Sequence, residues 1–269
     1  MGYVVDAAWL KRNGLGSSSV RDYVARGWLE RVGSRLYRRS QRMEGSGVAW
    51  ELAVLSLQQL LDAPVHVGGM TALELAGYWQ YVPMGRRTIW LYSGSDYARS
   101  YLGRLDLDAD VDLRRRNLFD DEDLGVETRN LDLVSSSISP IEATDARAGR
   151  YRNPLRVSGL ERAILEVLEQ VPHNISFEHG AELFDGLSTL RPRLVEALLH
   201  SCRSVKAKRL FLYFAREQSF AWTRKLKAAD IDRGTGKRQI VVGGELDPEF
   251  LITVPRKRRG ARRGAGMSR

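Results

Sequence analysis

The sequence predicts a mixed α/β fold in which a small basic N-terminal unit precedes a larger body. Segments with helical and with strand periodicity alternate up to about residue 150, and helical spacing dominates after it. Charge is also divided into blocks. Residues 1–42 hold nine Lys and Arg against three acids, residues 43–202 carry a net charge of −9, and residues 203–238 carry +8. This distribution is typical of a nucleic-acid binder with a separate body.

Residues 1–42 predict two helices and a hairpin. A helix over Val5–Asn13 ends at Gly14, and a second begins in the run Ser17–Ser19, any of which can cap it, and ends at Gly27. Strands then flank Gly33 and Ser34, where a type II′ turn is expected. The pattern predicts a winged helix-turn-helix, although the usual leading helix is missing or a different start was used.

This unit is expected to bind duplex DNA. Val20, Tyr23 and Val24 share one face of the second helix and should pack inward, leaving a polar, basic face outside. The alternative is an ordinary helical hairpin with a solvated basic face. The predicted DNA contacts combine the second helix with the hairpin and are Ser17, Ser18, Ser19, Arg21, Arg26, Arg31, Arg35, Arg38 and Arg39.

Residues 48–150 predict an α/β middle region, which follows a polar linker ending at Gly47. Its last part, from Asn117 to Arg150, is expected to be irregular. The expected elements are a helix over 48–62, a strand over 64–67, a helix over 70–76, a strand over 88–92 and a strand over 105–113.

Residues 151–255 predict a mostly helical C-terminal part of the body. Ser158 and Glu161 form a capping-box pattern before the first helix. Residues 256–269 are expected to form a disordered basic tail. The other expected elements are helices over 177–184, from Pro192 and over 206–217, and closing strands over 239–242 and 250–254.

The residue pattern does not predict an enzyme. Asp106, Asp108, Asp110 and Asp112 alternate along a strand and are best explained as a solvated face. The histidines lack metal-ligand spacing, Cys202 is the only cysteine, and no nucleophile–base pair is visible, so we expect no catalytic residues, metal or cofactor. An RNA- or nucleotide-processing enzyme that uses the acidic middle region remains the alternative. Without an apolar run of membrane-spanning length, a cytoplasmic protein is expected.

A second basic stretch interleaves cations with aromatic residues in the C-terminal part. It predicts either a polyanion-binding surface with stacking groups or a helix with an aromatic inner face and a basic outer one. The candidate surface residues are Arg203, Lys206, Lys208, Arg209, Arg224 and Lys225.

Six phrases along the chain point to one family. They are VSGLERAILE at 157–166, LRPR at 190–193, CRSVKAKRLFL at 202–212, GGMTALEL at 68–75, GKR at 236–238 and ITVP at 252–255. Together they resemble the abortive-infection antitoxin family of type IV toxin–antitoxin systems (AbiEi-like), over nearly the whole chain up to Pro255, and the arginine-rich tail departs from the family pattern. The resemblance implies a transcriptional autorepressor with an N-terminal winged helix that binds operator DNA, such as an inverted repeat. It also implies an antitoxin that counters a nucleotidyltransferase-like toxin without a stable complex. The field of the second basic stretch, for its part, suits a polyanion such as tRNA.

Overall fold

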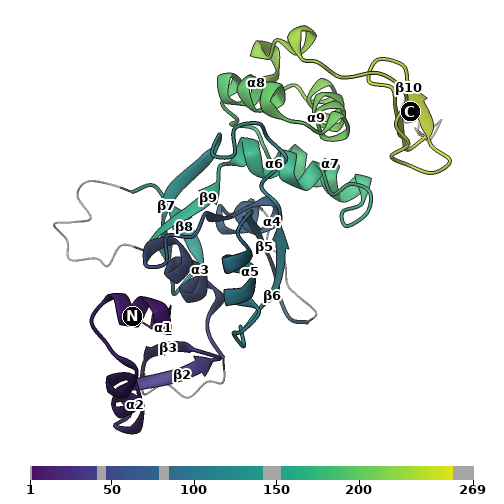
Figure 1. The fold of residues 1–269 in the computed structure, drawn as a ribbon. Helices are drawn as coiled ribbons and strands as arrows, with labels where there is room; N and C mark the ends of the chain where they lie inside the picture. The colour runs from purple at the N-terminus through teal and green to yellow at the C-terminus, as the bar shows by residue number, and fades with distance from the viewer. Residues whose placement is uncertain (1, 41–46, 79–84, 142–152, 257–269) are drawn as a thin grey trace, which may run out of the picture.

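The computed structural model describes residues 2–40, 47–78, 85–141 and 153–256 and shows the mixed α/β fold that the sequence predicts (Figure 1). A three-stranded sheet belongs to an N-terminal module, a six-stranded sheet forms the centre, and a two-stranded sheet closes the C-terminal end. Within the described ranges, no helix is long and apolar enough to cross a membrane. The elements are, in chain order, β1 (Val4–Asp6), α1 (Ala7–Arg12), α2 (Ser17–Ala25), β2 (Leu29–Gly33), β3 (Leu36–Arg39), α3 (Trp50–Gln59), β4 (Val65–Val67), α4 (Gly69–Leu75), β5 (Thr88–Ser93), α5 (Asp96–Leu102), β6 (Asp110–Arg114), β7 (Val126–Asp132), β8 (Ser137–Ser139), β9 (Pro154–Ser158), α6 (Leu160–Leu168), α7 (Phe177–Asp185), α8 (Pro192–Ser201), α9 (Val205–Glu217), the 3₁₀ helices η2 (Thr223–Lys225) and η3 (Ala228–Asp230), β10 (Glu245–Asp247) and β11 (Ile252–Val254).

The central sheet has the strand order β6-β5-β4-β9-β7-β8. β5 is parallel to β6 and β4 is parallel to β9, whereas the other neighbours are antiparallel. β7 and β8 lie where the sequence predicts irregular chain, and β9 lies where it predicts the start of a helical region. Those expectations are wrong. In β7, polar side chains such as Glu127 and Arg129, which form an ion pair, interrupt the apolar alternation that identifies a strand. In β9, Leu155 and Val157 are buried alternately, but the strand directly precedes the strong helical pattern of α6 and is hidden by it.

The helices that follow the predicted apolar spacing are confirmed, but two local predictions differ. Helix α5 has no counterpart among the predicted elements, although Ser95 caps it by accepting from the Ala98 amide at 3.3 Å. The predicted capping box at α6 is wrong, because Gly159 is its N-cap residue. The Ser158 hydroxyl instead donates to the Glu166 carboxylate at 2.9 Å.

The closing strands are also displaced along the chain. The sequence predicts a strand over 239–242, but the structure pairs β10 with β11 and leaves only an isolated bridge between Arg238 and Ile252. Ile240 is buried and the Val241 amide donates to the Thr253 carbonyl at 3.3 Å, so the segment runs beside β11, but Val242 is 87% exposed and the ladder does not continue. The predicted basic tail lies almost wholly outside the described residues.

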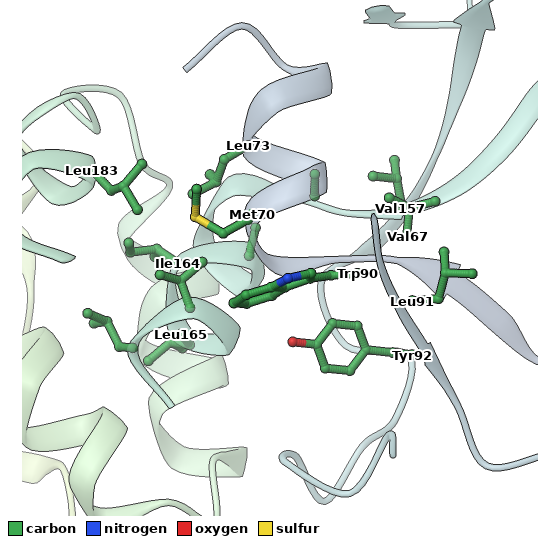
Figure 2. Packing of buried hydrophobic residues seen from close by; sticks show 14 of the residues in the cluster. Val67, Met70, Leu73, Trp90, Leu91, Tyr92, Val157, Ile164, Leu165 and Leu183 are labelled. Carbon is green, nitrogen blue, oxygen red and sulfur yellow. The ribbon is translucent and has the colours of Figure 1, made fainter. Parts of the chain in front are cut away.

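The main core forms where helices α4 and α6 meet the central sheet (Figure 2). Met70 and Leu73 of α4 face Ile164 and Leu165 of α6, and the ring of Trp90 from β5 lies beside them. The start of α4 requires glycine, because a Cβ on Gly69 would lie 2.3 Å from the Trp90 ring and its φ is +50°. This close contact fixes α4 against the sheet.

Candidate nucleic-acid interface

The N-terminal module is built on strands that separate two apolar clusters. In β1, Val4 joins the main core of the body, whereas Val5 joins a small cluster with Leu10 and Val20. Because successive side chains of a strand point to opposite faces, one strand can serve both clusters. The predicted helix start at Val5 is therefore wrong. The strand continues to Asp6, which caps α1 by accepting from the Trp9 amide at 2.7 Å.

Helix α2 presents an exposed polar N-terminus. Its N-cap residue is Gly16, which has no side-chain cap, so none of the serines has the capping role that the sequence allows. Ser17, Ser18 and Arg21 are exposed, and Ser19 is half-buried. Backbone N–H groups at an uncapped helix start, with the helix dipole behind them, favour phosphate and other anions.

The packed face of α2 is narrower than the sequence predicts. Val20 is 7% exposed and Tyr23 is half-buried, whereas Val24 is 36% exposed and does not pack inward as expected. Beyond the helix, Trp28 is 57% exposed. Its ring lies 5.2 Å from that of Tyr23, and the Arg26 guanidinium lies 5.6 Å from its centre. Sequence reasoning includes Arg26 but omits Trp28, because an isolated tryptophan gives no periodic signal.

The hairpin β2–β3, which we call the wing, turns at Ser34 and Arg35. Gly33 pairs with Leu36 and Arg35 has the positive φ, +59°, so the predicted type II′ turn with Gly33 as the first loop residue is wrong. Gly33 is needed for another reason, since a Cβ there would lie 2.3 Å from the Arg104 carbonyl oxygen. Arg35 is exposed at the tip of the wing.

The other wing arginines differ in their exposure and in whether an acidic residue binds them. Arg31 and Arg39 are exposed. Arg38 has a side chain that is 12% exposed, and it binds Glu30 through two hydrogen bonds of 2.9 and 3.1 Å. The wing therefore offers Arg31, Arg35 and Arg39 to a ligand, whereas Arg38 is held by its own hairpin.

Helix α5 and the residues that follow it hold the N-terminal module against the body. The Tyr101 hydroxyl donates to the Val4 carbonyl at 2.9 Å, and the Tyr97 hydroxyl donates to Asp6 at 2.8 Å. Arg104 donates to the Ser34 carbonyl in the wing turn at 3.1 Å. The module is thus docked on the body through side chains that are distant in sequence, and the polar linker alone gave no sign of this.

The second basic stretch is not gathered on one exposed surface. The Arg209 side chain is buried and donates to the carbonyls of Arg233, Gly234 and Gly236 at 2.8, 3.1 and 2.6 Å. Lys208 is 6% exposed, and burial lowers the pKa of the half-buried Lys206. The exposed members are Arg203, Arg224 and Lys225.

The aromatic members of this stretch lie in the core. Phe211, Phe214 and Trp222 are at most 4% exposed, and Phe184 contacts all three of them. These aromatic rings fill the space between α7 and α9, so they do not form a stacking platform.

The four aspartates of the acidic segment do not share one strand face. Only Asp110 and Asp112 belong to β6, whereas Asp108 accepts from the Trp50 amide at 2.8 Å, at the start of α3. Asp106 and Asp110 both face Arg86. Among the residues that the structure describes, no group of three or more His, Cys, Asp or Glu could hold a metal ion.

A buried ion pair connects the central sheet to α6. Glu166 accepts from Arg162 at 2.8 Å, from the Gly69 amide at 2.8 Å and from Ser158. Burial alone would raise its pKa, but hydrogen bonding to His66 and the charge of Arg162 lower the pKa to about 2. Burial lowers the pKa of His66, which stays neutral. The cluster fixes where strands and helices meet.

An exposed polar helix that carries serines and an arginine, beside a basic hairpin, is typical of proteins that bind duplex DNA. The comparisons give the family. Residues 86–255 match the family described as transcriptional regulator, AbiEi antitoxin, type IV TA system, and residues 1–84 match the AbiEi antitoxin N-terminal domain. The chain belongs to this family of transcriptional regulators, the AbiEi antitoxins of type IV toxin–antitoxin systems.

A solved structure supports the fold independently. The RV2827C protein from Mycobacterium tuberculosis is similar with a TM-score of 0.53, over 93% of this chain and 85% of that one, at 17% sequence identity. At this identity the likeness shows a shared fold. No curated protein matches the chain by sequence.

Proposed function

We propose that the protein represses its own operon by binding operator DNA through α2 and the wing. The observation that carries this proposal is the uncapped start of α2, where Ser17, Ser18 and Arg21 are exposed together. Serine and arginine at such a position reach base edges in the major groove, and Arg21 is suited to guanine.

The wing supplies contacts that do not depend on sequence. Arg31, Arg35 and Arg39 are exposed along it and would bind phosphates beside the groove that α2 enters. Arg26 and the ring of Trp28 extend this surface next to α2. Arg38 would act by orienting the hairpin through Glu30 unless DNA displaces that ion pair. Two copies on an inverted repeat would double these contacts.

We further propose that the body counters a nucleotidyltransferase-like toxin in the cytoplasm without a stable complex. Membership of the antitoxin family supports a role against a toxin. Exposed Arg203, Arg224 and Lys225 are the members of the predicted polyanion surface that could meet tRNA. The acidic segment gives no support for a nuclease, because its carboxylates cap α3 or pair with arginines.

A reporter gene behind the protein's own promoter tests the repressor role. Wild-type protein should repress the reporter, and Arg21→Ala should relieve repression. Arg193→Ala is the matched control, because Arg193 is exposed on α8, far from the module (Figure 1). Equal repression by wild type and Arg21→Ala would remove α2 from the interface.

Co-expression with the toxin encoded next to the gene tests the antitoxin role separately. Full-length Arg21→Ala should still rescue growth, because α2 is not proposed to act on the toxin. Arg224→Glu with Lys225→Glu should lose rescue if a polyanion binds there. Full rescue by the charge-reversed protein would show that Arg224 and Lys225 are solvated surface residues without a role against the toxin.

A further inference from the structure

A pocket of about 380 Å³ lies where the parallel strands β5 and β6 end. Its wall includes Tyr92 from β5, Arg114 and Arg115 at the end of β6, and Arg203 from the connection between α8 and α9. In open sheets, ligands commonly bind beyond the carboxyl ends of parallel strands. The pocket lies in the body and shares no residue with the proposed DNA contacts, but its Arg203 also belongs to the proposed polyanion surface.

The charges around this pocket leave one arginine without an acidic partner. Arg114 pairs with Asp112 and lies 4.0 Å from the centre of the Trp90 ring. Arg115 is exposed and forms no ion pair with any residue that the structure describes.

Arg203 is the second cation that a ligand could recruit. It binds Asp120, but both side chains are more than half exposed. Such an exposed ion pair contributes little and can exchange for a ligand anion.

The acidic residues of the wall do not neutralise the positive charge of Arg115. Glu166 is already bound by Arg162, and the Glu169 carboxylate accepts from the Ser204 hydroxyl. Lys206 lies beside Glu169 and donates to its backbone carbonyl. In this first pocket the charges of Glu166 and Glu169 are therefore matched by Arg162 and Lys206, and Arg115 supplies the unbalanced positive charge.

One buried residue of the pocket wall has a hydroxyl that lacks an acceptor. Tyr92 is 3% exposed, and its hydroxyl has no hydrogen-bond partner in the described part of the chain. Burial, together with the Glu166 carboxylate, raises the pKa of Tyr92 well above its usual value, so the hydroxyl keeps its proton. A buried hydroxyl without a partner is costly and calls for an acceptor.

A second pocket of about 360 Å³ adjoins the first and gives a ligand room to extend beyond it. It shares Arg115 and Asn117 with the first pocket and continues toward Ser93. Its wall also holds two acids, Asp96 and Glu122, and two further arginines, Arg99 and Arg116, of which Arg116 pairs with Glu122. A ligand bound at Arg115 can therefore extend into either side. Inorganic phosphate would leave most of this space empty.

We propose that this pair of pockets binds a small phosphate ester of about the size of a nucleoside monophosphate. Arg115 and Arg203 bind the phosphate, since guanidinium groups match phosphate oxygens with two parallel hydrogen bonds. Asn117, which lines both pockets, contacts the remainder of the molecule. The site would let a regulator of this family respond to a small phosphorylated metabolite.

Calorimetric titration of the full-length protein, without DNA, tests the proposal. The probes are AMP, UMP, inorganic phosphate and, as the uncharged match, adenosine. At least one nucleotide should bind more tightly than inorganic phosphate, and adenosine should not bind. Arg115→Ala should weaken nucleotide binding about tenfold or more, whereas Arg193→Ala should bind as wild type.

The contrary outcomes are equally definite. No binding of any phosphate probe, or equal binding by Arg115→Ala, would overturn the proposal. If inorganic phosphate binds as tightly as AMP, the proposal of a phosphate ester as the ligand is wrong and the site is a simple anion site. Binding of a single-stranded oligonucleotide, with no binding of mononucleotides, would show that the arginines serve nucleic acid instead.

Discussion

Replacing Arg162 by methionine should destabilise the body strongly. The Arg162 side chain is 1% exposed and that of Glu166 is fully buried, so the substitution leaves a carboxylate inside the protein without its cation. It also removes the donor to the Glu122 and Leu124 carbonyls, at 3.0 and 2.8 Å. Breaking a buried ion pair by removing one partner costs about 3–5 kcal/mol.

The pKa of Glu166 reflects the whole buried cluster, in which the effect of burial is outweighed by His66 and Arg162 together. Its value falls from 4.5 to about 2 on folding, which corresponds to about 3 kcal/mol. Because the folded value is depressed, this stabilisation is fully present above pH of about 4.5 and is lost as the pH falls toward 2. In Arg162→Met the carboxyl should take up its proton at higher pH, because burial then dominates.

Urea unfolding of wild type and Arg162→Met, at pH values from about 3 to about 7 in steps of roughly one unit, measures both the loss of stability and its pH dependence. Arg203→Met is the matched control, because the same substitution there breaks an exposed pair with Asp120 and should cost about 1 kcal/mol or less. A double variant, Arg162→Met with Glu166→Met, should recover much of the loss. If Arg162→Met costs no more than Arg203→Met, the buried pair does not hold the sheet and α6 together.

Three further outcomes follow from the contacts above. Arg209→Met should lower the free energy of unfolding in urea by about 2–4 kcal/mol, because three loop carbonyls lose their donor. Arg224→Met, at an exposed site, should be near neutral, and equal costs would refute a structural role for Arg209. Gly33→Ala should lower DNA affinity and melting temperature together, since its Cβ meets the Arg104 carbonyl, and an unchanged affinity would count against a fixed wing. Burial raises the pKa of the Cys202 thiol to about 11, so iodoacetamide at pH 8 should modify it only in unfolded protein, and rapid reaction of the folded chain would contradict this.

The sequence was informative where apolar spacing decides the structure. The spacing of Leu160, Ala163 and Ile164 predicts α6, and all three lie against the core or within it. Strands with polar inserts are a different case. β7 carries Glu127 and Arg129, which pair with each other, so its place in the sheet depends on partners that only the fold provides.

The candidate site shows the same limit. The basic face of α2 follows from local periodicity, and Arg21 is exposed as predicted. Whether an arginine is free, however, depends on distant chain. Arg209 looked like surface charge, yet it is enclosed by carbonyls of residues 233–236, which lie more than twenty positions away. Net charge counts such residues but cannot tell a ligand contact from a structural one.

The central claim is that α2 reads base edges while the wing binds phosphates. Fluorescence anisotropy over a series of salt concentrations, on DNA from upstream of the gene and on a scrambled duplex, tests it most directly. Arg21→Ala should reduce the preference for the upstream DNA by about 1–3 kcal/mol. Arg35→Ala should weaken binding to both duplexes and reduce the salt slope by about 1, with Arg193→Ala unchanged. Wild-type protein that binds both duplexes equally, or both variants binding as wild type, would contradict the account.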